Sequence, residues 1–313
     1  MAAKSTWPIA GIAASLLAIT GAPLLAQDYS GAFTFGYSSG SISDGTDSAD
    51  VTALTLHGTM QVQFPDGFRF GARLTHVSPD IEGLGGLDLQ IRGTELTAGY
   101  ALSNGAWFGV YSEDIGGSAE GIPGISLISL GQHYYGIEGG TNVAGVAVRG
   151  FYGSGNSVTS YGVSGRYGAD RYVVGGYFMH SDVTVSVPMS ADIDSYGIAG
   201  TYAVSDQIAL FGGVANSSVS AMGSDMADIM DYGIGASYSL SGMTSIPLFA
   251  SLEYSGAKVS NPSGPGESTL DGFTLSLTVP MGQSRSMVPE NSVAAAVLNP
   301  THSAISQLGL MSF

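Results

Sequence analysis

The sequence predicts an all-β protein: a transmembrane, antiparallel, up-and-down β-barrel of about fourteen strands, with sixteen strands as the alternative. Three observations lead to this prediction. Apolar and polar residues alternate with a period of two along most of the chain. The connections between the expected strands are mostly short and long in turn. Only 11 % of the 313 residues are charged, against about 25 % in soluble globular domains.

The composition excludes several classes of protein. The chain carries 25 acidic and 9 basic residues, and the few basic residues are scattered, so we expect no nucleic-acid partner. No cysteine is present, which excludes a disulfide scaffold and a cysteine-ligated zinc site. With 44 % hydrophobic residues, the chain is too apolar to be disordered.

Residues 1–26 have the layout of a secretory signal peptide. Lys4 supplies a positive charge, an apolar run extends from Ile9 to Thr20, and small residues lead to an expected cleavage after Ala26. The run is shorter than the roughly 20 apolar residues of a membrane-spanning helix. We therefore expect an exported protein that enters a membrane only through strands.

The clearest strand pair begins at Leu54. Even positions up to Phe64 are apolar or glycine, and the odd positions between them are Thr, His or Gln, as in a strand with one apolar face. Pro65-Asp66-Gly67 then supplies the residues of a tight turn. In the strand that follows, Arg69 and Arg73 share the polar face.

A repeat runs through the second half of the chain. The segments 161–167, 196–202 and 232–238 are near copies that begin and end with tyrosine, and short turns follow each of them. A repeat of this length contains two strands and two connections, which indicates a series of hairpins rather than a helical solenoid.

The alternation divides the chain into an even number of strands. Short turns and longer polar loops mostly alternate between these strands, as they do in barrels of the bacterial outer membrane. The expected strands cover residues 29–38, 51–64, 68–77, 88–101, 106–112, 125–140, 143–153, 158–168, 171–182, 192–204, 208–219, 228–240, 246–259 and 268–281.

The two faces of these strands differ in composition. One face carries Ser, Thr, Gln, Gly and scattered charges, while the other is aliphatic and has aromatic residues near both strand ends. Two aromatic rings around an aliphatic band are typical of a barrel whose outer face meets lipid, so the polar face would line the lumen. A large β-sandwich or β-solenoid with half-buried tyrosines is the alternative. The aromatic residues are Phe64, Tyr100, Tyr167, Tyr202 and Tyr238 before short turns, and Tyr37, Tyr111, Tyr161, Tyr196, Tyr232 and Tyr254 near long loops.

In its signal peptide, its Tyr-Gly-Ile/Val-x-Gly-x-Tyr strands and its acidic, cysteine-free composition, the chain resembles the Gram-negative outer-membrane porins, and among them the general porin type of α-proteobacteria. The resemblance covers residues 27–281, the expected barrel domain. It implies an outer-membrane location, passive diffusion of small hydrophilic solutes and ions, and a homotrimer.

The resemblance also implies a constriction in the pore. In such porins the third outer loop folds into the lumen, and its acidic residues face a cluster of arginines. Here the third long connection is acidic, and the third and fourth strands carry arginines on faces that we expect to point inward. The implied constriction consists of Glu113, Asp114 and Glu120 opposite Arg69, Arg73 and Arg92.

Further charges are expected in the lumen from the strand alternation. They either set a field that selects ions or form ion pairs that close a narrow barrel. The acidic excess favours a preference for cations. These residues are Arg149, Arg166, Glu138, Asp194, Asp231 and Glu253.

Residues 282–313 depart from the porin pattern. Residues 291–298 and 304–313 form the last two strands in the sixteen-strand alternative, with Phe313 as the closing residue. In the fourteen-strand interpretation, which we favour, residues 282–313 are a periplasmic or plugging tail.

Two functions are consistent with the sequence. The first is a diffusion porin, preferring cations, with outer-membrane lipid and lipopolysaccharide as its surroundings. The second is a structural or adhesive barrel with a plugged lumen. A hydrolase would need histidine beside serine or acidic residues on one rim, which the strand alternation does not provide. We expect no catalytic residue, metal site or cofactor.

Overall fold

The computed structural model describes residues 28–83, 88–120, 130–186, 189–244, 246–261, 266–284 and 286–311. The expected signal peptide, residues 1–26, lies outside the described residues, as does Phe313. Within these described ranges, no helix is both long and apolar enough to cross a membrane.

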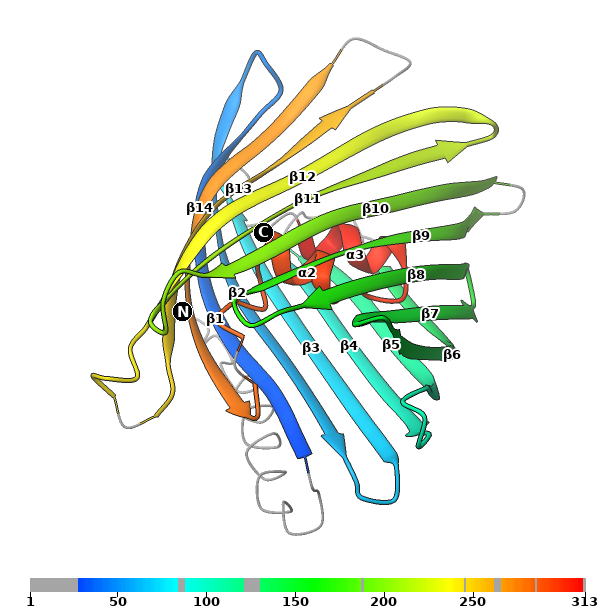
Figure 1. Ribbon diagram of the computed structural model, residues 1–313. Helices are drawn as coiled ribbons and strands as arrows, with labels where there is room; N and C mark the ends of the chain where they lie inside the picture. Colours follow the sequence, from blue (N-terminus) through cyan, green and yellow to red (C-terminus); the bar gives the residue numbers. More distant parts are fainter. Residues whose placement is uncertain are drawn as a thin grey trace, which may run out of the picture.

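Fourteen antiparallel strands form one closed barrel (Figure 1). Each strand pairs with its neighbours in the chain, and β1 pairs with β14, with Ser30 opposite Gly282. The fourteen-stranded barrel predicted from the sequence is therefore confirmed. The strands are β1 (Asp28–Ser43), β2 (Ser48–Gln63), β3 (Phe68–Ile81), β4 (Asp88–Ala101), β5 (Trp107–Glu120), β6 (Leu130–Val143), β7 (Val146–Gly155), β8 (Val158–Gly168), β9 (Tyr172–Ser186), β10 (Met189–Ala203), β11 (Ile208–Ala221), β12 (Ser224–Ser239), β13 (Phe249–Ser260) and β14 (Glu267–Gly282).

Several strands extend into segments where the sequence predicts long loops. β5 continues to Glu120 instead of ending at residue 112, so Glu113 and Asp114 lie in a strand and not in a loop. The loop expected at 220–227 is a two-residue turn, in which Met222 and Gly223 have φ angles of 53° and 75°. Positive φ at both central positions is the type I′ geometry that matches the twist of a hairpin.

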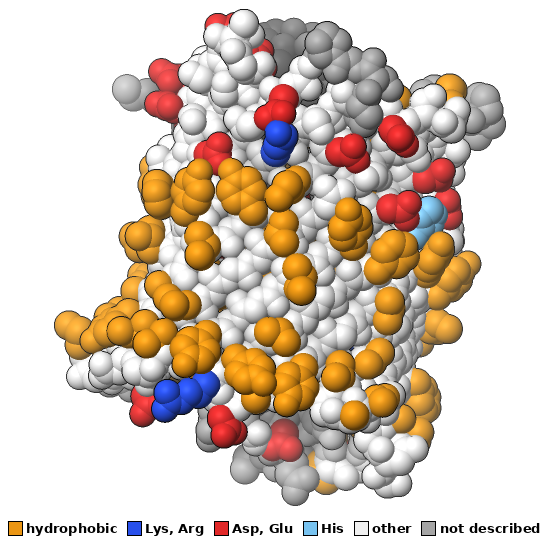
Figure 2. Space-filling view, turned by 45° about the horizontal axis from the view of Figure 1, so that its top comes forward, with side chains coloured by type: hydrophobic (Ala, Val, Ile, Leu, Met, Phe, Trp, Pro, Cys, Tyr) orange, Lys and Arg blue, Asp and Glu red, His pale blue; other side chains and the backbone are white. Residues whose placement is uncertain are grey.

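The barrel is apolar outside and polar inside. Leu54 is 49 % exposed on the outer face, whereas the alternate residues Thr55 and His57 are buried inside. Figure 2 shows hydrophobic side chains over the middle of the outer face and acidic side chains gathered along its upper margin. The expected orientation of the two faces is confirmed. Tyr111 is an exception among the expected aromatic rings, because it is buried and points into the lumen.

The C-terminal tail, residues 286–311, lies inside the barrel and forms two short helices, α2 (Val293–Leu298) and α3 (Ala304–Met311) (Figure 1). Ser292 caps α2, because its Oγ accepts a hydrogen bond from the N–H of Ala295 (3.0 Å). The sixteen-strand alternative is wrong for these residues. Since β1 and β14 already pair, the barrel leaves no free edge to which further strands could add.

The main apolar core lies between α2 and the inner face of β9–β12. Glycines on this wall make room for the helix. A Cβ atom on Gly197 would lie 3.0 Å from Val297 Cγ2, and one on Gly213 would lie 3.3 Å from Ala294 Cα. The tail therefore packs closely against these glycines, with Phe211 buried beside it.

Candidate functional site

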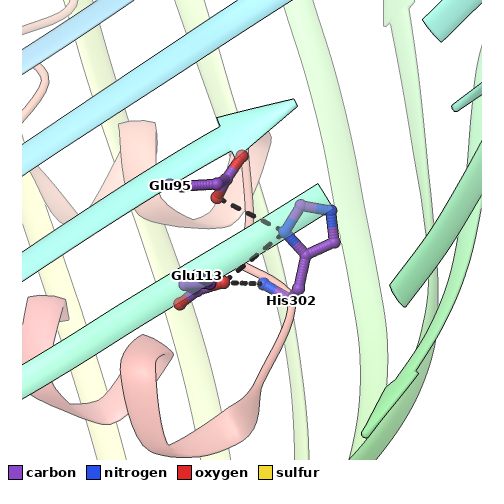
Figure 3. A group of neighbouring side chains, drawn as sticks. All are labelled: Glu95, Glu113 and His302. Atoms are coloured by element: carbon purple, nitrogen blue, oxygen red, sulfur yellow. Dashed lines mark hydrogen bonds and ion pairs between the residues drawn. The ribbon is translucent and has the colours of Figure 1, made fainter. Parts of the chain in front are cut away.

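The polar contacts between tail and barrel converge on His302, in the segment that joins α2 to α3. Its side chain is fully buried. Glu95 on β4 lies directly opposite Glu113 on β5, and Figure 3 shows both carboxylates directed at the His302 ring. Like charges directly opposite each other in a sheet repel, so the histidine occupies the position where a positive charge is favoured.

The ring of His302 is fixed on both edges and on one face. Nδ1 lies 3.4 Å from Glu95 Oε2 and 3.5 Å from Glu113 Oε2, while Nε2 lies 3.2 Å from Glu138 Oε2 on β6. The backbone N–H of His302 also donates a hydrogen bond to Glu113 Oε2 (3.1 Å). The ring stacks on Tyr111, with 3.5 Å between the ring centroids and 13° between the planes.

The carboxylates change the protonation of this histidine. Burial disfavours the charged imidazolium, but the charge of Glu95 and the hydrogen bonds with Glu113 and Glu138 outweigh burial and raise the pKa of His302 to about 9. Arg149 acts in the opposite direction, because its guanidinium contacts Nε2. The balance at this point of the lumen still favours positive charge.

Three arginines hold the turn between the two helices. Arg73 donates a hydrogen bond to the Asn299 carbonyl oxygen (2.9 Å) and lies 3.4 Å from Glu95. Arg149 donates to Glu138 (2.8 Å) and to the carbonyl oxygen of Pro300 (3.3 Å). Arg166 donates to Asn299 Oδ1 (3.1 Å). These three inward arginines therefore bind the tail itself.

Other strands contact the tail around the circumference of the lumen. Glu253 on β13 accepts a hydrogen bond from the N–H of Val293 (3.2 Å). Ser181 on β9 accepts one from the N–H of Ala304 (3.0 Å), and Thr34 on β1 accepts one from the N–H of Glu290 (3.0 Å). Asp231 on β12 is also buried, and neither of its carboxylate oxygens has a hydrogen-bond partner among the described residues.

Small cavities flank Arg73 between the tail and the wall. One is lined by His57, Glu290 and Asn299, and the other by Glu95 and residues around it. Each has a volume of about 20 Å³, which is roughly the space needed for one water molecule. In this part of the lumen the tail thus fills the barrel down to the size of water.

Most of the charges expected in the lumen do point inward. Arg69 lies apart from His302 and the carboxylates around it, with its guanidinium carbon 4.1 Å from the centre of the Trp107 ring. The other inward residues contact the tail or lie in the wall beside it: Arg73, Glu113, Arg149, Arg166, Glu138, Asp231 and Glu253.

Three expected lumen residues are on the outer face instead. Arg92 lies three positions before the inward Glu95 on β4, so it points to the opposite face, and it donates a hydrogen bond to Gln90. Asp114 bonds to His133 (2.9 Å), and Asp194 bonds to His180 (2.8 Å). Glu113 and Asp114 are neighbours in β5 that point to opposite faces, so these two acidic residues do not face the arginines together from a loop. The side chain of Glu120 lies outside the described part of the chain.

The sequence interpretation did not identify Glu95, Tyr111 or His302 as members of a site. The sequence does indicate the orientation of Glu95. Its neighbour Leu96 belongs to the apolar positions that face outward and is 63 % exposed, so Glu95 faces inward. No comparable signal marks His302, since the tail has no strand alternation. Its position depends on how the tail folds back into the lumen.

A closed fourteen-stranded barrel with an apolar exterior and a polar lumen is a transmembrane β-barrel. The chain belongs to the Gram-negative porin family, whose profile matches residues 31–260. The protein is therefore a member of an outer-membrane channel family. None of the curated proteins matches the chain.

Solved structures of outer-membrane proteins resemble the barrel. A FadL homologue of Pseudomonas aeruginosa has a TM-score of 0.52 at 14 % identity, over 81 % of this chain and 90 % of its own. An outer membrane channel from Pseudomonas putida F1 gives 0.46 at 10 % identity, over 82 % and 97 %. A loop-deletion mutant of OmpT, an outer membrane protein of Vibrio cholerae, gives 0.41 at 13 % identity, over 82 % and 100 %. At 14 % identity the likeness to the FadL homologue is one of fold.

Proposed function

We propose that the protein is a non-enzymatic channel for passive diffusion of small hydrophilic solutes and ions, and that its C-terminal tail is the gate. The observation that carries this proposal is the way the tail is held. Side chains of Arg73, Arg149 and Arg166 bind the turn at Asn299 and Pro300 through hydrogen bonds. Water can replace such bonds at a net cost of about 1.5–3 kcal/mol each, because the donors are charged.

The wall behind the tail supports this proposal. It carries many short hydroxyl side chains, which bind water well and leave room for solutes once the tail moves. The tail follows β14, which ends at Gly282, so displacement requires movement only about that connection. The inward hydroxyl residues include Thr34, Thr55, Thr75, Ser160, Ser181, Ser195, Ser217, Ser237, Ser251, Thr274, Ser276 and Thr278.

A preference for cations is part of the proposal. The described lumen carries the carboxylates of Glu95, Glu113, Glu138, Asp231, Glu253 and Glu290 against the guanidinium groups of Arg69, Arg73, Arg149 and Arg166, so carboxylates are in excess. In a narrow channel such charges raise the local concentration of cations. We further propose that outer-membrane lipid and lipopolysaccharide surround the apolar band, and that the protein assembles as the homotrimer implied by the porin resemblance. The export of the chain through a cleaved signal peptide at residues 1–26 belongs to the same proposal.

Single-channel recording in planar bilayers tests the function. With a salt gradient across the membrane, we expect stepwise openings and a reversal potential that indicates cation preference. Glu113→Gln should reduce that preference and Arg73→Ala should increase it, because each changes one charge on the lumen wall. Silent membranes from correctly folded protein would contradict the channel.

One observation favours a second function. The tail fills the lumen beside Arg73 down to cavities of about 20 Å³, as in a structural or adhesive barrel with a permanent plug. The bilayer recordings separate the two functions, because a permanent plug gives no openings under any of these conditions.

A further inference from the structure

We propose that Glu95, Glu113 and His302 form a binding site for a divalent transition-metal ion of the zinc type, which pins the C-terminal tail to the barrel wall. The three ligand atoms lie within 4.8 Å of one another, and all three residues are buried. They come from β4, β5 and the tail, so a bound ion would join the tail to two strands. The consequence for gating rests on the proposed channel function, whereas metal binding does not.

The distances between the ligand atoms fit a metal better than a hydrogen bond. Nδ1 of His302 lies 3.4 Å from Glu95 Oε2 and 3.5 Å from Glu113 Oε2. A charge-assisted hydrogen bond to a carboxylate is about 2.7–2.9 Å long. Nitrogen and oxygen ligands at about 2.0–2.1 Å from a tetrahedral zinc ion lie roughly 3.3 Å apart. The observed separations are close to that edge length.

A buried carboxylate oxygen points into the site without a hydrogen bond. Oε2 of Glu95 accepts none from the described residues, although Glu95 is only 8 % exposed. The guanidinium of Arg73 and the ring of His302 both lie 3.4 Å from this oxygen. A buried polar atom left without a hydrogen bond is costly, and a metal–oxygen bond would satisfy it.

The surroundings of His302 match those of metal-binding histidines. A ligating histidine usually bonds through its second ring nitrogen to a carboxylate, which fixes the tautomer and the ring orientation. Here Nε2 lies 3.2 Å from Glu138 Oε2 and also contacts the Arg149 guanidinium, while Nδ1 faces Glu95 and Glu113. Stacking on Tyr111 holds the ring in this orientation.

The charges around the ring leave room for one cation. Three carboxylates, those of Glu95, Glu113 and Glu138, face the guanidinium groups of Arg73 and Arg149. Three negative and two positive charges leave one negative charge, so the cluster favours a cation; a proton on His302 brings the sum to zero, and a divalent ion on the neutral ring brings it to one positive charge. An imidazole ligand with only two carboxylates suits zinc better than calcium or magnesium, which take six or more oxygen ligands or retain water.

A second group of similar residues provides the control. His180, Asp182 and Asp192 also lie within ligand distance of one another, but they are on the outer face, where both aspartates are exposed. The His180 nitrogens already bond to Asp182 and Asp194. His180→Ala removes this group without touching the lumen.

Calorimetric titration with Zn²⁺ tests the proposal on the full-length protein in detergent micelles, after metal removal with a chelator. We expect His180→Ala to bind one Zn²⁺ per chain and the His180→Ala, His302→Ala double variant to bind none. Adding Glu138→Gln to His180→Ala should keep the site but weaken it by about 10- to 100-fold. Adding Glu95→Gln to His180→Ala should also weaken Zn²⁺ binding. This variant tests the site if the His302→Ala protein does not fold.

Two results would overturn the metal site. One is a His180→Ala protein that binds no Zn²⁺, and the other is stoichiometric binding that survives both the His302 and the Glu95 substitutions. Conductance plays no part in this experiment. A channel without Zn²⁺ binding would reject only the metal site, and Zn²⁺ binding by a silent barrel would reject only the channel.

Discussion

Gly197 on β10 lies directly beneath Val297 of the tail, so that a Cβ atom on the glycine would approach Val297 Cγ2 to 3.0 Å. Gly197 follows Tyr196, which is 52 % exposed on the outer face. The Tyr-Gly pair therefore has two roles in two copies of the repeat, Tyr196-Gly197 and Tyr232-Gly233. The tyrosine belongs to the outer aromatic band, and the glycine makes room for α2, since a Cβ atom on Gly233 would lie 3.0 Å from Val293 Cγ2.

A larger residue at position 197 should disturb the tail. Gly197→Val places two methyl groups where Val297 and Tyr177 already lie within about 3 Å of the new Cβ, and such overpacking costs about 1–3 kcal/mol. We expect more frequent openings in bilayer recordings. Gly131→Val is the matched control, because nothing lies within 4 Å of a Cβ at that strand position. Equal opening frequencies in the two variants would show that close packing at Gly197 does not hold the tail in the lumen.

Loss of Arg149 should destabilise the protein. Arg149→Ala removes the hydrogen bonds to Glu138 and to Pro300 and leaves a buried carboxylate with less compensation. We expect a loss of about 3 kcal/mol in denaturant unfolding. Arg92→Ala should change the stability by less than about 0.5 kcal/mol, because Arg92 lies exposed on the outer face. A large effect at Arg92 would place it in the lumen after all.

A charge in the middle of the outer face should be costly only in lipid. Ile234 on β12 is 68 % exposed, and Ile234→Arg should lose about 2–4 kcal/mol of folding free energy in bilayers if it faces the hydrocarbon. Met226→Arg, near the beginning of the same strand, should lose no more than about 1 kcal/mol. Folding titrations into lipid vesicles measure both, and similar costs at the two positions would contradict a lipid-facing band.

Asp44, in the loop between β1 and β2, should keep its carboxylate charged down to about pH 2. Backbone N–H groups of Asp47 and Thr46 donate hydrogen bonds to Asp44 and lower its pKa from 3.8 to about 2. Because the pKa is lowered in the folded loop, the stabilisation is present above pH 3.8 and is lost as the pH falls through about 2. Carboxyl NMR titration measures this pKa, and a value near 4 would mean that the turn does not form.

The fold could be predicted from the sequence because the strand alternation is a local signal. The hairpin from Leu54 onward shows its apolar outward phase in the residues themselves, and the even number of strands with alternating short and long connections is typical of a closed barrel. The orientation of some charges could not be predicted in the same way. Arg92, Asp114 and Asp194 are polar and yet face outward.

The reason for these errors is strand length. Strands of about 9–11 residues suffice to cross a bilayer, but β5 has 14 residues and β10 has 15. The strand ends next to the expected long loops extend beyond the length that crosses the bilayer. A polar residue there can therefore point to either face. An error of one residue in the phase also exchanges the two faces, which is how Arg92 was assigned to the lumen instead of Glu95.

The site itself was only partly predictable. Arg73, Glu138 and Arg149 were identified from their positions on the inward face, whereas Glu113 was expected in an infolded loop and lies in β5. The role of His302 depends on contacts between residues almost two hundred positions apart, such as its hydrogen bond to Glu113, and no local pattern encodes them. The helices of the tail form because Ser292 and the alanines around it suit a helix, while the closed barrel offers no edge for strands.

The central claim is that solutes pass only when the tail leaves the lumen, and an engineered disulfide tests it most directly. The chain has no cysteine, and a Cβ atom on Gly213 would lie 3.3 Å from Ala294 Cα, so the two positions are in direct contact. In Gly213→Cys, Ala294→Cys protein, oxidation should abolish single-channel openings and reduction should restore them, with neither single variant responding. Openings that persist unchanged in the fully oxidised protein would contradict the claim.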